Sequence, residues 1–310
     1  MPPTQGLTKY YGKTCVLKGT TYGVRYSDCF GLVGASGAGK TTTFAIITGS
    51  TLPNSGLAIL GNRPVHGNAI VGYCPQFDSL LGCLSAFQNM EIVAGLVGYR
   101  HPRRKVREIL HKLGLSRHCS KCYSSLSGGQ KRRISVGVAM LSLSPCLILD
   151  EPTAGIDPEA RRDVWKLLDG ELDEGRSLLL SSHSMEECEA HCSRIGVLCR
   201  GRLIAIGDSQ TLKNRHANKF VLHVVLTSVK DRQHVVAAIA GKFPDSTLIT
   251  KREDVLNLKW HIMKKESDRF HVLYDSVQHL ASSLPVHDFC LTEASLEDVF
   301  IILNQKYDTE

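Results

Sequence analysis

One segment restricts the possible folds of this chain more than any other. It reads Gly34-Ala35-Ser36-Gly37-Ala38-Gly39-Lys40-Thr41 and matches G-x-x-x-x-G-K-[ST] between a strand candidate and a helix expected to begin near Lys40. The glycines let backbone N–H groups, with the helix N-terminus behind them, wrap around the β- and γ-phosphates of a nucleotide. Lys40 adds a positive charge, and the Thr41 hydroxyl can bind Mg²⁺. For this motif alone, the alternative is a glycine-rich turn with an accidental lysine.

The first roughly 210 residues alternate between short apolar strands and helices, which predicts a layered α/β core with parallel strands. Residues that can act chemically follow each strand candidate, and ligands bind at the carboxyl ends of the strands in open α/β sheets. The layout therefore also predicts a phosphate site. The strand candidates are Cys29 to Val33, Ala69 to Tyr73, Leu147 to Asp150 and Ser177 to Ser181.

Two adjacent carboxylates follow the apolar stretch Cys146-Leu147-Ile148-Leu149. Asp150 can hold Mg²⁺ through water. Because successive side chains on a strand diverge, Glu151 can point toward the water that attacks the γ-phosphate and act as a general base. An Asp-Glu pair after a strand is more often a turn, but here it follows a phosphate loop at a suitable interval.

The segment Leu126-Ser127-Gly128-Gly129-Gln130 precedes a helical run, and ordinary phosphate-loop enzymes have no such segment. A Ser-Gly-Gly turn that opens a helix is a second anion site. Since the phosphate loop already binds the chain's own nucleotide, we expect Ser127 and Gly129 to contact the γ-phosphate bound to a partner domain. Two domains would then enclose two ATP molecules head to tail.

With these motifs in this order, the chain resembles the nucleotide-binding domains of ABC transporters along its whole length. The resemblance implies a P-loop NTPase core of the ABC ATPase type, α/β in class, that binds ATP and Mg²⁺. Tyr11 matches the aromatic residue that stacks on adenine, with Tyr10 as the neighbouring alternative. Gln76 matches the Q-loop, which reports on Mg²⁺ and water to the transmembrane partner, and Asp157 matches the D-loop across the dimer. His183 matches the switch histidine that contacts the γ-phosphate.

The resemblance implies three sets of site residues. The catalytic set is Glu151, His183 and Gln76, and the metal set is Thr41, Gln76 and Asp150. The nucleotide-binding set is Tyr11, Gly34, Ala35, Ser36, Gly37, Ala38, Gly39, Lys40, Thr41, Thr42, Ser127, Gly128, Gly129, Gln130 and Asp157.

Two domains are expected, at residues 1–217 and 218–310. Within the first, residues from about 77 to 145 resemble the α-helical subdomain that contacts the membrane-spanning part of a transporter. This insertion is too short for the coiled coil of DNA-repair relatives, so nucleic acid is not an expected partner. A single set of motifs also argues against translation-linked relatives, which carry two such domains.

The second domain is predicted from its periodicities as strand, helix, two strands, helix, strand and helix, which resembles a ferredoxin-like α+β fold. A turn near Arg252 to Asp254 separates the two central strands, Ser246 to Thr250 and Val255 to His261. Ser267 is expected to cap the second helix. Ser295 and Asp298 form a capping box before the last one.

Several short segments of the sequence resemble subfamily A of the ABC transporters. Members of this subfamily are large eukaryotic proteins that mostly move lipids or sterols. The segments include Gln76-Phe77-Asp78-Ser79-Leu80-Leu81 and Leu296-Glu297-Asp298-Val299-Phe300. We therefore expect an ATPase domain with a C-terminal regulatory domain, at the cytoplasmic face of a membrane transporter of lipid-like substrates. Its partners would be a second nucleotide-binding domain and the transmembrane domains. The alternatives are the ATPase subunit of a drug or polysaccharide exporter, and a non-transport regulatory ATPase.

Composition is compatible with these expectations. No apolar run is long enough to span a bilayer, so the chain lacks the membrane domain of subfamily A and is expected to be either a piece of a longer protein or a separate subunit. Met1-Pro2-Pro3 begins no secretory signal, which predicts the cytosolic side of the membrane. The 11 scattered cysteines are typical of a reducing compartment. Cys119 and Cys122, and likewise Cys188 and Cys192, lack a second pair at zinc-finger spacing, which favours simple thiols. The net charge of +7 is modest, and its densest basic stretch, residues 100–107, is interpreted as a solvated helix face.

Overall fold

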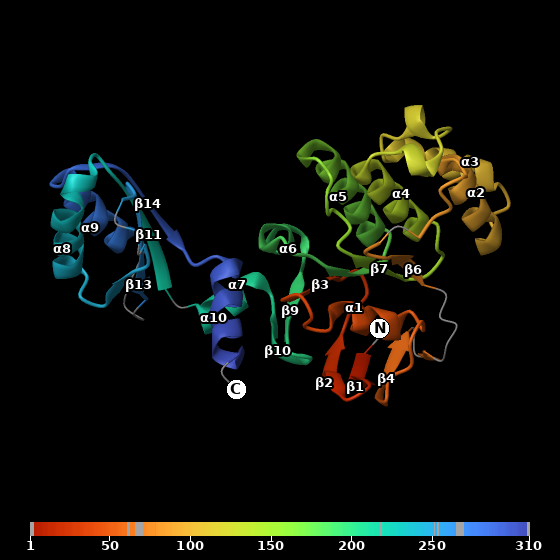
Figure 1. The fold of residues 1–310 in the computed structure, drawn as a ribbon, viewed down its shortest axis with the longest axis horizontal. Coiled ribbons are helices and arrows are strands. Elements are labelled where there is room, and N and C mark those ends of the chain that lie inside the picture. Colours follow the sequence, from red (N-terminus) through yellow and green to blue (C-terminus); the bar gives the residue numbers. More distant parts are fainter. Residues whose placement is uncertain are drawn as a thin grey trace. The chain divides into compact units, whose positions relative to one another are not determined.

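The chain folds into two compact units, Met1–Ser209 and Gln210–Glu310 (Figure 1). The computed structural model describes residues 3–60, 63–65, 71–77, 79–217, 219–250, 252, 254–264 and 270–308. Several residues that entered the predictions above lie outside these ranges, namely Met1, Pro2, Ala69, Ile70, Asp78, Glu253 and Ser267. The two compact units meet between Ser209 and Gln210, eight residues before the predicted domain boundary after residue 217. Helix α7 (Ser209–His216) packs with the second unit, where the Gln210 amide donates to the Glu293 carboxylate at 3.5 Å.

The first unit contains a six-stranded sheet in the order β10-β9-β3-β8-β7-β6. Its five strands from β9 to β6 are parallel, and β10 pairs antiparallel with β9 at the edge. The three central strands are buried at every residue, as parallel strands covered on both faces require. The strands are β3 (Cys29–Gly34), β6 (Gly72–Cys74), β7 (Cys146–Asp150), β8 (Ser177–Ser181), β9 (Arg194–Cys199) and β10 (Arg202–Gly207).

A second, antiparallel sheet accompanies the first, in the order β2-β1-β4-β5. Helix α1 (Lys40–Ile47) contacts strands of both sheets and fills the space between them (Figure 1). Its Phe44, Ile46 and Ile47 are buried in one apolar core with residues from both sheets. The strands are β1 (Pro3–Tyr11), β2 (Thr14–Gly23), β4 (Ser55–Leu60) and β5 (Arg63–Pro64).

Helices between β6 and β7 form the expected helical subdomain, coloured from orange through yellow to green in Figure 1. They are α2 (Ala86–Val97), α3 (Pro102–Lys112) and α4 (Gly128–Met140), with short 3₁₀ turns at Ser116–His118 and Tyr123–Ser125. Helix α4 contacts β6 and β7, so it joins the subdomain to the sheet. Two more helices, α5 (Pro158–Asp173) and α6 (Met185–His191), follow β7 and β8.

The second unit is built on a four-stranded antiparallel sheet in the order β12-β13-β11-β14. With two helices between the strands, this order is the ferredoxin-like arrangement that the periodicities predicted. Trp260, Phe220 and Val235 lie in its core, and Ser295 with Asp298 forms the expected capping box before α10. The elements are β11 (Lys219–Leu226), α8 (Arg232–Lys242), β12 (Ser246–Leu248), β13 (Asn257–Met263), α9 (Phe270–Ser282), β14 (Val286–Glu293) and α10 (Leu296–Asp308).

The parallel sheet positions the chemistry of the first unit. Strands β3, β6, β7 and β8 all point the same way, so the segments that follow them meet at one edge of the sheet. Among the described residues, no helix combines the length and apolar character needed to cross a membrane.

Candidate functional site

The phosphate loop turns tightly between β3 and α1. Gly39 occupies the N-cap of α1 with a φ of 107°, a conformation that only glycine adopts without strain. A Cβ atom at Gly34 would lie 2.5 Å from the carbonyl oxygen of Leu198 on β9, so a side chain there would displace the neighbouring strand. The sequence therefore places glycine at two positions where the loop's path admits no larger residue.

A cavity of about 300 Å³ opens above this loop. It brings together residues from five separate segments of the first unit. Its lining residues are Tyr11, Val16, Ser36, Gly37, Ala38, Gly39, Lys40, Thr41, Thr42, Gln76, Glu151 and His183. Tyr11 is half exposed and lines the cavity, whereas Tyr10 is not among the lining residues, which favours Tyr11 as the stacking aromatic.

Lys40 lies beneath the loop, and the residue is 7% exposed. Its Nζ donates to the carbonyl oxygens of Gly34 at 2.6 Å and Ala35 at 3.2 Å. Burial lowers the pKa of Lys40, while the nearby charges of Glu151 and Asp150 act to raise it. The Lys40 ammonium is thus held against the phosphate loop by two backbone carbonyls, where it can bind an anionic ligand.

Asp150 is buried at the end of β7, with 1% of its surface exposed. It accepts a hydrogen bond from Thr41 Oγ1 at 3.1 Å on one oxygen and from the Ser181 hydroxyl on the other. Ser181 stands directly opposite Asp150 in the parallel ladder of β7 and β8. The aspartate and the phosphate-loop threonine, both predicted to hold Mg²⁺, therefore lie side by side.

Glu151 has an unusual backbone for a residue other than glycine, with a φ of 54°. Its side chain is 12% exposed, and its Oε1 lies 2.6 Å from His183 Nε2. Gln76 Nε2 donates to the same oxygen at 3.3 Å. The three residues expected to be catalytic thus form one hydrogen-bonded group at the mouth of the cavity.

Chemically, this set of groups fits a nucleoside triphosphate with Mg²⁺. The backbone N–H groups of the loop and one ammonium are available to phosphates, and a hydroxyl beside a carboxylate offers hard oxygen ligands for a metal ion. A second carboxylate, held by an imidazole and an amide, can accept a proton from water. The same chain contributes all of these groups.

The Ser127 segment lies elsewhere. Ser127 is the N-cap of α4 and forms a capping box with Gln130: Gln130 N donates to Ser127 Oγ at 3.3 Å, and Ser127 N donates to Gln130 Oε1 at 3.1 Å. A Cβ at Gly129 would come within 3.1 Å of the Gly155 carbonyl oxygen, which explains glycine there. Asp157 caps α5 by accepting from Ala160 N at 3.1 Å. Neither Asp157 nor residues 127–130 line the cavity.

Two residues of the site were not singled out from the sequence. Ser181 binds Asp150, and the buried Arg132 contacts the backbone on either side of the cavity. The pairing of parallel strands could have placed Ser181 opposite Asp150, whereas nothing in the basic run around Arg132 distinguishes that side chain from its neighbours. Cys119 and Cys122, and Cys188 and Cys192, are free thiols, and no three potential metal ligands among His, Cys, Asp and Glu cluster in the described ranges.

Comparison with known proteins agrees with this geometry. The family model described as ABC transporter matches residues 17–154. The chain is 46% identical over 299 residues to ABC transporter ced-7 of Caenorhabditis elegans, an alignment that covers 96% of this chain and 18% of that protein. The chain belongs to the ABC transporter family.

Other relatives place this ABC domain with subfamily A. It is 34% identical over 314 residues to the human retinal-specific phospholipid-transporting ATPase ABCA4, covering 95% of this chain and 13% of that protein. It is 33% identical over 318 residues to ATP-binding cassette sub-family A member 2 of Rattus norvegicus, covering 99% of this chain and 13% of that one. The chain thus spans less than one fifth of the length of these relatives.

Solved structures share the fold of the ABC domain. One, described as the ATP-binding subunit of an ABC transporter, superposes with a TM-score of 0.66 at 24% identity and covers 70% of this chain and 93% of its own. Another is a dimeric ATP-binding cassette in a post-hydrolysis state, bound to ADP and Pi, with a TM-score of 0.63 at 22% identity over 67% of this chain and 98% of its own. The predicted ABC ATPase core is confirmed.

Proposed function

We propose that this domain binds ATP with Mg²⁺ and hydrolyses it at a site completed by a second such domain. In its complete protein, hydrolysis would drive lipid-like molecules across a membrane from the cytoplasmic face. The observation that carries the proposal is the Glu151 carboxylate, which His183 and Gln76 hold at the mouth of the phosphate-loop cavity. A structural turn has no need of such an arrangement.

Each group has a distinct role in the proposed hydrolysis. Lys40 and the backbone of residues 34–41 bind the phosphates, with Thr42 beside them. Thr41 and Asp150 would hold Mg²⁺, which neutralises phosphate charge when bound, and the Gln76 amide oxygen remains available to the same ion. Glu151 accepts a proton from the attacking water, while His183 keeps its carboxylate in position.

The proposal includes a second nucleotide-binding domain because Ser127 and Gly129 do not line the cavity of their own chain. The N-terminus of α4 there presents backbone N–H groups and a hydroxyl suited to an anion. We propose that residues 127–130 contact the nucleotide held by the partner, with Asp157 also at the dimer contact. A dimeric ATP-binding cassette among the structures that share the fold supports this arrangement.

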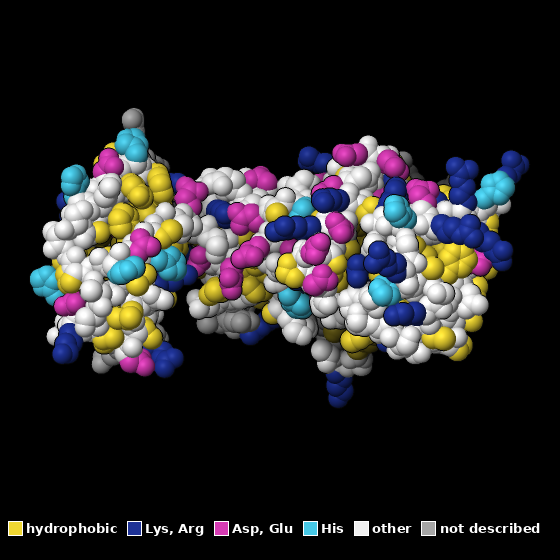
Figure 2. Space-filling view, turned by 90° about the horizontal axis from the view of Figure 1, so that it is seen from above, with side chains coloured by type: hydrophobic (Ala, Val, Ile, Leu, Met, Phe, Trp, Pro, Cys, Tyr) yellow, Lys and Arg dark blue, Asp and Glu magenta, His cyan; other side chains and the backbone are white. Residues whose placement is uncertain are grey.

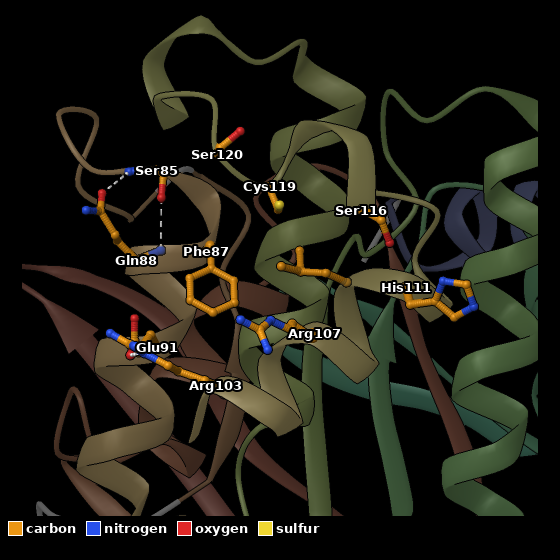
Figure 3. A pocket seen from close by; sticks show the side chains of 11 residues that line it. Ser85, Phe87, Gln88, Glu91, Arg103, Arg107, His111, Ser116, Cys119 and Ser120 are labelled. Atoms are coloured by element: carbon orange, nitrogen blue, oxygen red, sulfur yellow. Dashed lines mark hydrogen bonds and ion pairs between the residues drawn. The ribbon is translucent and has the colours of Figure 1, made fainter. Parts of the chain in front are cut away.

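The helical subdomain offers a surface for the membrane part. A groove of about 810 Å³ runs between α2, α3 and the turn that follows them, and Figure 3 shows Phe87 and Arg107 pointing into it side by side. The Arg107 guanidinium lies 5.9 Å from the centre of the Phe87 ring. Figure 2 shows Lys and Arg side chains gathered at this end of the first unit. A groove that joins an aromatic ring to arginines suits a protein segment carrying both apolar and acidic side chains.

Two apolar side chains of the helical subdomain and the segment before it are strongly exposed. Phe77, directly after Gln76, is 78% exposed, and Leu96 on α2 is 83% exposed. Aromatic and apolar side chains are enriched in the buried centres of protein–protein interfaces. We propose that transmembrane domains dock here and sense the nucleotide through Gln76.

Lipid as the transported class rests on the relatives, one of which is named a phospholipid-transporting ATPase. The test is to reconstitute the full-length protein in liposomes and follow labelled phospholipid or sterol with ATP, beside a Glu151→Gln control. The proposal expects lipid redistribution that depends on ATP and Glu151. Movement of a water-soluble solute without lipid movement would favour a drug or polysaccharide exporter, and hydrolysis without any transport would favour a regulatory ATPase.

A further inference from the structure

Arg132 lies on α4 and is 7% exposed, although the described residues offer it no carboxylate as a hydrogen-bond partner. The four described acceptors of its guanidinium are backbone carbonyl oxygens. Nε donates to Glu151 at 2.9 Å, Nη2 to Asp150, and Nη1 to Pro75 and, at 3.4 Å, to Gln76. One buried side chain therefore joins the two segments that carry the Mg²⁺ and water ligands of the proposed site.

The backbone at Glu151 requires such support. A non-glycine residue with φ of 54° is strained by about 1–3 kcal/mol and persists only when its surroundings fix it. Its N–H donates to the Ser181 carbonyl at 3.2 Å and lies 3.1 Å from Ser181 Oγ, so β8 fixes one side of the residue. Arg132 binds its carbonyl and fixes the other side. The Ala154 N–H also donates to this carbonyl, at 3.2 Å, but that bond closes a turn within the same segment, whereas Arg132 ties Glu151 to the segment of Pro75 and Gln76.

We infer that Arg132 is a positioning residue for ATP hydrolysis, which sets the Glu151 carboxylate and the Gln76 amide at the distance that activation of water requires. This inference rests on the proposed hydrolysis. The planar guanidinium is essential because its donors diverge toward carbonyls of two different loops. A lysine ammonium carries the same charge at a single point and cannot span them.

The test compares Arg132→Lys and Arg132→Gln with wild type and with Arg176→Lys. Arg176 serves as the control because its guanidinium also donates to backbone carbonyls, of Ser144 at 3.0 Å, Met140 and Ser142, outside the cavity lining; unlike Arg132 it also pairs with a carboxylate, that of Glu171. Steady-state kinetics give kcat and KM for ATP, and thermal unfolding confirms that each variant is folded. Hydrogen–deuterium exchange of peptides covering residues 71–77 and 146–152 is measured without nucleotide.

We expect kcat to fall on the order of 10-fold in Arg132→Lys and 100-fold in Arg132→Gln, as for residues that support metal ligands, with KM for ATP changed less than about twofold. In both Arg132 variants, hydrogen–deuterium exchange should be faster than in wild type in the peptides that cover residues 71–77 and 146–152. Arg176→Lys should lower the unfolding temperature yet keep kcat within about twofold, since a purely structural arginine does not act on the chemical step.

Two results would overturn the inference: kcat of Arg132→Gln within twofold of wild type, or parallel losses of kcat, ATP binding and unfolding temperature that Arg176→Lys reproduces. Failure of the proposed function looks different, because wild type itself would then show no Glu151-dependent hydrolysis. In that case the exchange measurement decides, and unchanged exchange at residues 71–77 in Arg132→Gln would refute the positioning role.

Discussion

Replacement of Lys40 by alanine should weaken ATP binding by a margin that the structure allows to be estimated. The ammonium is buried and already oriented by the carbonyls of Gly34 and Ala35, at 2.6 and 3.2 Å, so little reorganisation accompanies its contact with a phosphate. A hydrogen bond that involves a charged group contributes about 1.5–3 kcal/mol. At about 1.4 kcal/mol per tenfold change, the Kd for ATP should rise roughly 10- to 150-fold.

The assay is titration of a ribose-labelled fluorescent ATP with Mg²⁺ against wild type and Lys40→Ala. Lys166→Ala is the control, because that lysine is 78% exposed on α5 and outside the cavity. Its Kd should equal that of wild type. A folded Lys40→Ala protein that binds ATP within twofold of wild type would refute the reasoning, since the cavity would then not be where the phosphates bind.

Three further predictions address the dimer, the second unit and pH. Ser127→Arg should leave ATP binding by the monomer within about twofold but abolish hydrolysis; loss of monomer binding would show that the segment acts within its own chain. A chain ending after Ser209 should still bind labelled ATP. A truncated protein that folds but does not bind ATP would refute the claim that the first unit alone forms the nucleotide site. Burial lowers the pKa of His223 and His261 below the ordinary 6.5, so the unfolded chain takes up protons first and stability should fall as pH drops below that value. Trp260 fluorescence in a Trp165→Phe background should show the unfolding midpoint decreasing from pH 7.5 to 5.5, and a flat profile would contradict the assignment.

Much of the site follows from the sequence because parallel strands impose a common direction. Once Val33, Asp150 and Ser181 are placed at strand ends, the segments after them must meet at one edge of the sheet. The ferredoxin-like unit was also predictable, since its stripes of apolar residues at helical and strand spacing are regular. The parallel sheet and the ferredoxin-like unit can both be predicted because their apolar residues recur at regular spacing.

Arg132 shows why the remainder could not be predicted. It stands in the run Lys131-Arg132-Arg133, and such a run is normally a solvated helix face. Only the rotation of α4 against β6 and β7 decides which of the three side chains enters the protein. The strained backbone of Glu151 is equally hidden, because it results from hydrogen bonds with residues distant in the sequence. The domain boundary depends likewise on packing, since α7 could have joined either unit.

The central claim, that Glu151 activates water in a composite ATP site, is tested most directly by steady-state hydrolysis with Glu151→Gln beside wild type, with ATP binding measured on the same samples. The amide keeps the size of the side chain and its place beside His183 but cannot accept the proton. Turnover should fall by roughly 10²–10⁴-fold while the Kd for ATP stays within about twofold. Equal hydrolysis by the two proteins would contradict the account.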